Sequence, residues 1–230
     1  MSVTAKYLSA GVKHALLLME WQLFSPSPTL HGQKPLGSGV TDFFVMSLPN
    51  FSDSCTRVDV LFDRYVKNSI KGGTRDKRKE KKNTGIRRNV DNRDQRIGNW
   101  ERFIILEDNK ASLAHFLSTE ISESYSAPPG RELVINGGLK DTLKVWSSDT
   151  SRQDIRELAS DHEEADTRIV LHARDAAARG YKQVNILCRD TDVLVLLLAR
   201  REQLCQEIWM FAGTSRQRRY TPGPGCSEPD

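Results

Sequence analysis

Hydrophobic residues recur along the chain in short runs whose composition and spacing are typical of strands. Residues 57–63 (RVDVLFD) and 183–188 (QVNILC) have the β-branched and aliphatic composition of buried strands. Residues 207–213 (EIWMFAG) show the same pattern, and residues 132–146 predict a strand, a Gly-Gly turn and a second strand. The core of the protein is therefore expected to contain a β-sheet.

Apolar residues at helical spacing separate these strands. Residues 100–121 and 165–176 each place apolar side chains on one face of a helix, and residues 193–204 predict a buried helix. For the second of these helices we expect Ser160 or Asp161 as the N-cap and Gly180 as the stop. Because strand and helix alternate, the fold class is expected to be α/β, with a parallel sheet and helices on its faces.

The first part of the chain gives weaker patterns. Residues 15–24 predict a helix, whereas residues 24–39 are rich in Pro, Gly and Ser and predict a loop. We therefore treat residues 1–52 as an unassigned N-terminal segment and residues 53–220 as the folded domain. Residues 221–230 have the composition of a C-terminal tail.

Positive charge is concentrated in residues 64–102, which we call the basic arm. It holds fourteen Lys and Arg against five Asp and Glu, a net charge of +9, whereas the whole chain carries +4. Its first part, 65–82, predicts a helix interrupted by two glycines, and 83–99 predict a mobile loop. Nucleic acid is the commonest partner of such a surface. The alternative is a solvated loop that has no partner.

Composition limits the classes of protein further. With 230 residues, 38% hydrophobic and 28% charged, the chain forms one large or two small domains. No run of 18 apolar residues predicts a transmembrane helix, and the apolar run 15–19 is too short for a secretory signal. The cysteines lack paired spacing, so we expect reduced thiols in an intracellular protein, nuclear or cytoplasmic, neither secreted nor in a membrane. They are Cys55, Cys188, Cys205 and Cys226.

Carboxylates follow two of the predicted strands and begin one of the helices. Asp63 follows the first strand, Asp190 and Asp192 follow the strand 183–188, and Glu164 and Asp166 lie in the first turn of the helix between them. Ligands of a parallel sheet bind beyond the carboxyl ends of its strands, so these acids are expected to meet at one edge.

Such a group of like charges predicts a cation between them. Carboxylate oxygens suit Mg²⁺ or Mn²⁺, and two such ions can support phosphodiester hydrolysis. The alternative is that each acid has a structural role. Glu163 and Glu164 then stabilise a helix N-terminus, and Asp190 or Asp192 caps the next helix.

Taken together, the segments HEEADTRI and VNILCRDTDVLVLL resemble the flap-endonuclease-like branch of the PIN nuclease fold. Glu164 and Asp166 match that family's Glu-x-Glu pair, with Asp in place of the second Glu, and Asp190 and Asp192 match its Asp-x-Asp pair. Asp63 falls on a family metal ligand, followed here by Arg64 where the family usually has Gly. The resemblance covers roughly 57–220 and implies a three-layer PIN-like fold and a metal-dependent nuclease that acts on DNA or RNA.

The resemblance also assigns basic residues. The family places a lysine and an arginine seven positions apart on the basic helix near the cleaved phosphate, and Lys71 and Arg78 keep that separation. The nucleic-acid-binding residues expected on this basis are Lys71, Arg75, Lys77 and Arg78. The segment "FDRY…SIK…TRDKR" also resembles metazoan proteins of this fold that are often associated with mobile elements.

Two family features are not found in the sequence. Residues 1–56 show no equivalent of the family's first strand and its acid, Asp42 being the nearest acid, and the family's further acid after the Asp-x-Asp pair also has no equivalent. We therefore expect a fragment, incomplete at both ends of the fold, that binds Mn²⁺ and cleaves slowly or not at all. The competing hypotheses are a non-catalytic module of the same fold that binds nucleic acid or a protein, and a structural domain with a solvated basic loop.

Overall fold

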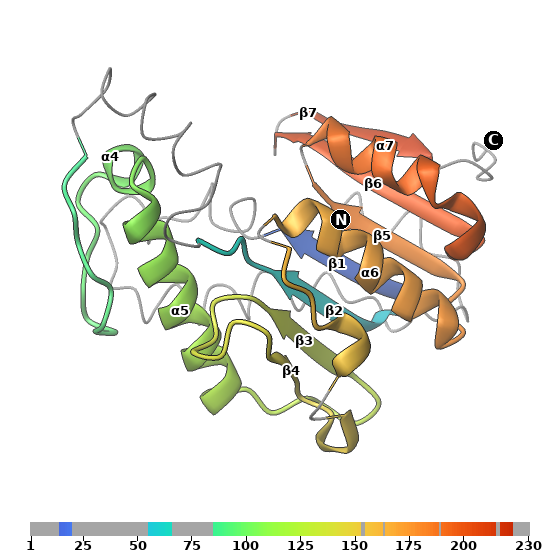
Figure 1. Ribbon diagram of the computed structural model, residues 1–230, viewed down its shortest axis with the longest axis horizontal. Coiled ribbons are helices and arrows are strands. Elements are labelled where there is room, and N and C mark those ends of the chain that lie inside the picture. Colours follow the sequence, from blue (N-terminus) through green and yellow to red (C-terminus); the bar gives the residue numbers. More distant parts are fainter. Residues whose placement is uncertain are drawn as a thin grey trace.

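The computed structural model describes residues 14–19, 55–65, 85–152, 155–162, 164–188, 190–214 and 217–222. Within these residues the chain forms one seven-stranded sheet with helices packed against it, an α/β architecture (Figure 1). The strands are β1 (His14–Met19), β2 (Cys55–Leu61), β3 (Glu132–Asn136), β4 (Val145–Ser147), β5 (Gln183–Leu187), β6 (Glu207–Thr214) and β7 (Gln217–Pro222). The helices are α4 (Trp100–Ile104), α5 (Glu107–Ser124), α6 (Ala165–Ala178) and α7 (Thr191–Ala199), with 3-10 turns η3 (Thr150–Arg152), η4 (Arg156–Leu158) and η5 (Arg201–Gln203).

The strand order of the sheet is β4-β3-β2-β1-β5-β6-β7. The inner five strands are parallel to their neighbours, and β4 and β7 pair antiparallel at the two edges. The chain proceeds from β1 through β2 to β3 on one side, and β5 and β6 then lie on the other side of β1. The strand order therefore reverses between β1 and β5, which is where open parallel sheets bind ligands.

The central strand β1 corrects the prediction of a helix over residues 15–24. Residues His14–Met19 form a strand that pairs with β2 on one side and β5 on the other. A short apolar run cannot be assigned to strand or helix by periodicity alone, because a central parallel strand is apolar on both faces. The segment 1–52 thus contributes the middle strand of the sheet.

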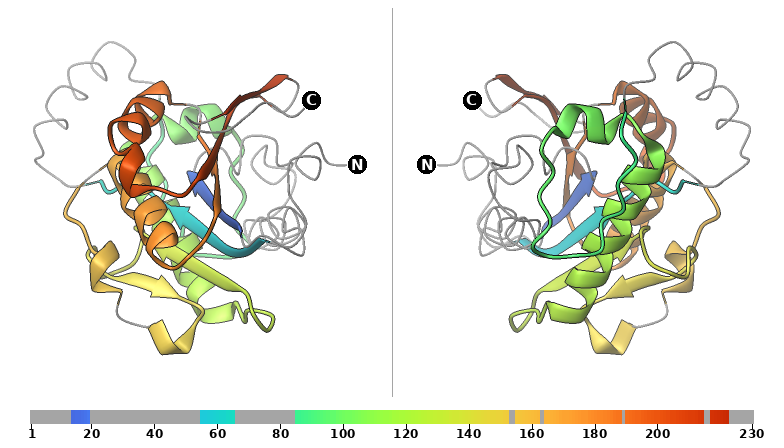
Figure 2. Two further views of the ribbon diagram at one scale, coloured as in Figure 1. Left: turned by 90° about the vertical axis from the view of Figure 1, so that its right-hand side faces the viewer. Right: turned by 90° about the vertical axis from the view of Figure 1, so that its left-hand side faces the viewer.

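Helices cover both faces of the sheet. Adjacent residues of β2 point to opposite sides, and Val60 belongs to an apolar cluster with α4 and α5, whereas Leu61 belongs to a cluster with α6 and α7. The side views show α6 and α7 next to each other on one side of the strands (Figure 2). Residues 85–99 form neither helix nor strand, but Val90 and Ile97 anchor this segment in the first cluster.

Several predicted elements are confirmed, and others have different boundaries. Strands β2, β3, β4, β5 and β6 lie where the sequence predicts them, and Gly180 follows α6 with a positive φ. The helix predicted over residues 100–121 is divided into α4 and α5. The predicted N-cap of α6 is wrong, because this helix begins at Ala165 with Glu164 as its N-cap residue. Helix α7 is only partly buried, since Val195 and Leu198 are exposed.

The turn after β3 brings the ends of β2 and β3 into close contact. Gly137 has φ +98, and a Cβ atom there would lie 2.4 Å from the carbonyl oxygen of Phe62. Gly138 has φ +73, and its Cβ would lie 2.5 Å from the carbonyl oxygen of Ala114 on α5. Only glycine fits at both positions, so this pair fixes how closely α5 approaches the carboxyl ends of β2 and β3.

Candidate functional site

The first acid of the predicted site, Asp63, joins two segments that are distant in the sequence. It follows β2 by two residues, and its side chain is half-buried. Asp63 Oδ1 accepts a hydrogen bond from the backbone N–H of Ala165, the first residue of α6, at 2.9 Å. A carboxylate at a helix N-terminus satisfies an otherwise free N–H and interacts favourably with the helix dipole. The carboxyl end of β2 is thereby held at the start of α6.

Glu164 and Asp166 lie on either side of that contact. Glu164 is the N-cap residue of α6 and makes no side-chain capping bond, and Asp166 lies in the first turn. Both side chains are partly buried. The two acids predicted at the start of this helix therefore lie beside Asp63.

Asp190 and Asp192 come from a third segment, the connection between β5 and α7. Asp190 is the N-cap of α7, and its Oδ1 accepts a hydrogen bond from the Asp192 N–H at 2.9 Å. Both side chains are exposed. Helix capping, the structural alternative for Asp190, is thus realised in the structure, and it leaves the carboxylate of Asp192 unused by the cap.

The five acids, which we call the acidic cluster, are linked by their electrostatic effect on Asp166. The pKa of Asp166 is raised from its ordinary value to about 6, first by burial and then by the neighbouring charges of Asp190, Asp63, Glu164 and Asp192. Like charges disfavour ionisation only at short range. All four other members of the cluster therefore act on Asp166, although they come from three separate segments.

A buried thiol lies beneath the cluster. Burial raises the pKa of Cys188 to about 12, and the charges of Asp166, Asp190 and Asp63 act in the same direction. Cys188 is therefore a neutral thiol at physiological pH and does not supply a thiolate ligand. The described cysteines, Cys55, Cys188 and Cys205, are all free thiols, as the sequence predicts.

The chemistry of the cluster suits a hard divalent cation, but its arrangement is not that of a preformed cage. Carboxylate oxygens are the donors that Mg²⁺ and Mn²⁺ prefer. Within the residues that the structure describes, no group of three or more His, Cys, Asp or Glu side chains is arranged to hold a metal ion. Two oxygens, Asp63 Oδ1 and Asp190 Oδ1, are committed to backbone N–H groups.

Sequence reasoning missed the strand at the centre of this edge. Because β1 runs parallel between β2 and β5, its carboxyl end faces the same edge as the acidic cluster; Met19 pairs with Leu61, and Leu18 with Leu187. In the sequence the next residue is Glu20, which lies outside the described residues. The strand His14–Met19 is therefore an element of residues 1–56 that the sequence did not predict.

A buried polar network beneath α6 was also missed. Arg168 is fully buried and donates hydrogen bonds to the backbone carbonyls of Phe62, Asn136 and Glu164. It also donates to the Asn136 side chain at 2.9 Å. One guanidinium thus holds the carboxyl ends of β2 and β3 against the first turn of α6, where the acidic cluster begins.

The same network continues along the sheet. Asn136 Nδ2 donates to His172 Nε2 at 2.8 Å, so His172 Nδ1 carries the proton and donates to Asp59 Oδ2 at 2.6 Å. Asp59 also pairs with Arg57 at 2.6 Å. Burial alone would raise the pKa of Asp59, but Arg57 and His172 outweigh it and lower the pKa to about 2. Burial lowers the pKa of His172, which supports its neutral form. The sequence contained an indication of this network. Arg57 and Asp59 are two positions apart and lie on one face of a strand, and Arg168 and His172 are four positions apart and lie on one face of α6.

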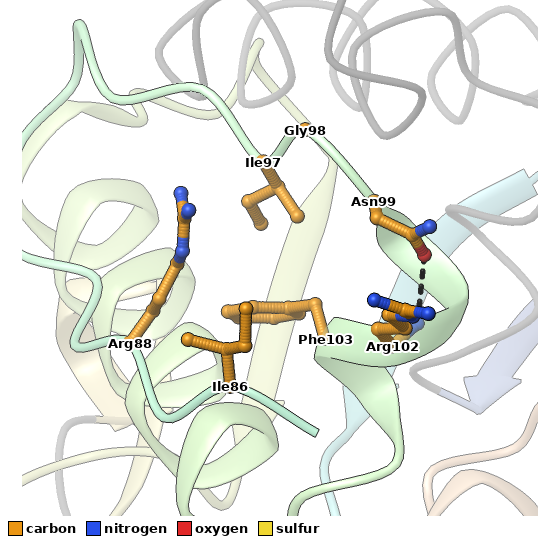
Figure 3. Close-up of a pocket in the computed structure, with 7 residues that line it drawn as sticks. All are labelled: Ile86, Arg88, Ile97, Gly98, Asn99, Arg102 and Phe103. Atoms are coloured by element: carbon orange, nitrogen blue, oxygen red, sulfur yellow. Dashed lines mark hydrogen bonds between the residues drawn. The ribbon is translucent and has the colours of Figure 1, made fainter. Parts of the chain in front are cut away.

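The predicted nucleic-acid-binding residues, Lys71, Arg75, Lys77 and Arg78, lie outside the described residues. The described part of the basic arm carries exposed arginines around a small hollow of about 90 Å³. Arg88 and Arg102 lie on either side of the Phe103 ring and Ile97 in this hollow, and Asn99 Oδ1 accepts from the Arg102 N–H (Figure 3). Positive charge is therefore present on the surface of this part of the arm.

Comparisons of the chain with protein-family models, with curated proteins and with solved structures found no match. Within the described part of the chain, no helix has both the length and the apolar character needed to cross a lipid bilayer.

Proposed function

We propose that this chain is a PIN-like domain that hydrolyses phosphodiester bonds of DNA or RNA with the help of Mg²⁺ or Mn²⁺. One observation carries the proposal. Asp63 accepts a hydrogen bond from the first N–H of α6, between Glu164 and Asp166, and the charges of Asp63, Glu164, Asp190 and Asp192 all raise the pKa of Asp166. A protein gains no stability from such repulsion, and a bound cation removes it.

The architecture supports the same proposal. The sheet has parallel inner strands, its strand order reverses between β1 and β5, and helices lie on both faces. This α/β architecture is the class to which a PIN-like fold would belong. The acidic cluster follows β2 and β5, the two neighbours of β1. The cluster therefore lies where this topology places ligand sites.

Each group of residues has its own role in this proposal. Asp63, Glu164, Asp166, Asp190 and Asp192 would hold the cation, which would supply an activated water and charge stabilisation for the leaving oxygen. Arg168 positions the first turn of α6 against the ends of β2 and β3. Lys71, Arg75, Lys77 and Arg78 contact the phosphate backbone, where positive charge gives affinity without sequence preference.

A second candidate function is a non-catalytic nucleic-acid-binding or protein-binding module of the same fold. It is favoured by the bonds that Asp63 and Asp190 make to helix N–H groups, because a capping carboxylate has fewer oxygens left for a metal. In this case the basic arm still binds nucleic acid, and the acidic cluster has only a structural role.

A nuclease assay separates the two candidates. The parent chain and Asp190→Asn/Asp192→Asn are incubated with single-stranded and branched DNA and RNA in Mn²⁺, and the products are followed by electrophoresis. We expect slow cleavage by the parent and none above background by the variant, because each lost carboxylate weakens the hold on the cation.

The other outcomes decide against the proposal. Cleavage that persists in the double variant shows that the acidic cluster is not the catalytic centre. If neither protein cleaves and both bind the substrates with equal, salt-sensitive affinity, the non-catalytic module is the correct function.

A further inference from the structure

A pocket of about 300 Å³ lies directly beside the acidic cluster, with Asp63 in its wall. It is formed by the end of β2, the middle of α5 and the loop that follows β3. Its lining residues with polar side chains are Asp63, Arg64, Tyr65, His115, Lys140 and Thr142. Its volume is at the lower end of the range for small-molecule sites. A pocket of this size accommodates a single nucleotide but not a longer segment of a strand.

Arg64 is the unusual residue of this pocket. It is only 7% exposed, and its Nε and Nη2 atoms have no hydrogen-bond partner among the described residues. A buried guanidinium with unpaired N–H groups costs the fold free energy, so such groups usually have a partner. A guanidinium that lines a pocket with its Nε and Nη2 atoms unpaired is therefore suited to an anionic ligand.

The other charges around Arg64 define what kind of anion fits. Lys140 adds a second positive charge to the lining, and Asp63 adds a negative one at the side of the acidic cluster. Burial lowers the pKa of Arg64, and the charges of Asp161 and Asp141 act in the opposite direction. An arginine guanidinium stays protonated in proteins, and a tetrahedral phosphate suits both its fork and the neighbouring ammonium.

The walls of the pocket are fixed by close packing. His115 Nδ1 donates to the carbonyl of Gly138 at 2.8 Å, and Ser118 donates to the carbonyl of Gly137 at 3.0 Å. The remaining lining includes the apolar side chains of Ala111, Ala114 and Leu139. The pocket thus combines a cationic end with an apolar wall, as a nucleotide with its phosphate and base requires.

We infer that this pocket binds one nucleotide of a nucleic-acid strand, with Arg64 holding a phosphate group beside the acidic cluster. The inference rests on the proposed function for its class of ligand, nucleic acid, and adds the residue and the place that receive it. The phosphate is either a terminal monoester, which has three non-bridging oxygens, or an internal diester, which has two; each can accept hydrogen bonds from both free N–H groups of the guanidinium.

The test is binding without any divalent metal. Short 3′-labelled single-stranded oligonucleotides, one with a 5′-phosphate and one with a 5′-hydroxyl, are titrated in EDTA, and fluorescence anisotropy gives the affinity. Arg64→Gln is expected to weaken binding about tenfold or more, because a charge-assisted contact is lost. The control Arg174→Gln removes an equal charge from an exposed site on α6 and is expected to change the affinity less than about twofold.

A second variant covers the case in which Arg64→Gln does not fold. Ala111→Leu keeps Arg64 and a good helix former on α5 but fills the pocket, and it is expected to weaken binding to a similar extent. Loss of affinity for the 5′-phosphate strand alone supports a terminal monoester, and equal loss for both strands supports an internal diester.

Unchanged affinity in both Arg64→Gln and Ala111→Leu overturns the inference. Because the titration contains no metal, this result does not bear on the acidic cluster. Conversely, if the chain binds oligonucleotides through Arg64 but does not cleave them in Mn²⁺, the result supports the nucleotide pocket and contradicts the proposed catalysis.

Discussion

Asp166 is half-buried among four other carboxylates, so its ionisation costs more in the folded chain than in the unfolded chain. Its pKa is about 6 in the folded state, against an ordinary value of 3.8. Between these two values the folded state binds more protons, so the free energy of unfolding falls as the pH rises through this window. Above pH 6 the whole penalty is present.

Asp166→Asn is therefore expected to stabilise the metal-free protein at pH 7.5. We expect a gain on the order of 1 kcal/mol, once solvent screening at this half-exposed site is allowed for. The gain should approach zero at about pH 3, below both pKa values, where Asp166 is mostly protonated in both states. Urea unfolding at pH 7.5 and at about pH 3 measures it, with the exposed Asp91→Asn as the control. An equal effect of Asp166→Asn at both pH values would show that the cluster does not strain this residue.

The position of Asp63 and Asp190 beyond neighbouring strand ends was predictable, but the contacts that these acids make were not. Parallel strands have their carboxyl ends at one edge, so Asp63 and Asp190 were expected there from sequence order alone. The bond from Ala165 to Asp63 spans 102 positions, and the bond from His172 to Asp59 spans 113. Local periodicity contains no information about such pairs, so the buried network became visible only in the fold.

At the scale of elements, β1 shows where pattern reasoning is weakest. Strands with alternating or β-branched residues, such as β2 and β5, were predicted close to their observed bounds. The run His14–Met19 has no period that separates a fully buried strand from a helix. Its assignment depends on β2 and β5, which flank it, and not on its own sequence.

Helix α6 depends on Arg168 for its position, and this gives a second prediction. Arg168→Leu removes the donor for carbonyls of β2 and β3 and leaves them buried without partners. We expect a loss of about 3 kcal/mol in the free energy of unfolding. Arg174→Leu on the exposed face of the same helix should change it by less than about 0.5 kcal/mol. Equal effects of the two substitutions in urea unfolding would contradict the anchoring role.

The turn after β3 gives a third prediction with a matched control. Gly138 and Gly130 have nearly the same φ, +73 and +75, but only Gly138 lies against α5, whereas nothing lies within 4 Å of a Cβ at Gly130. Gly130→Ala is expected to cost about 1 kcal/mol from backbone strain alone. Gly138→Ala should cost about 3 kcal/mol, because the contact with Ala114 is added to the strain. If thermal unfolding gives the two variants the same stability, the contact with Ala114 adds no cost at position 138 and the prediction is wrong.

At the scale of the whole molecule, negative charge gathers in the acidic cluster and positive charge in the basic arm. The two meet in the sequence shortly after β2, where Asp63 is followed directly by Arg64. The sequence predicted this division of charge, because clustering of like charges is visible in the order of residues. The position of Arg64 in a pocket beside Asp63 was not predictable, because it depends on the packing of α5 and the turn after β3.

The most direct test of the account is the binding of Mn²⁺ to the whole chain, measured by isothermal titration at pH 7.5. Residues from three segments come together only in the folded state. Mn²⁺ should therefore bind the folded parent chain and raise its melting temperature. Asp190→Asn/Asp192→Asn should abolish the binding, whereas the exposed pair Asp91→Asn/Asp94→Asn should leave it unchanged. No binding of Mn²⁺ by the parent chain, or the same affinity in Asp190→Asn/Asp192→Asn, would contradict the account.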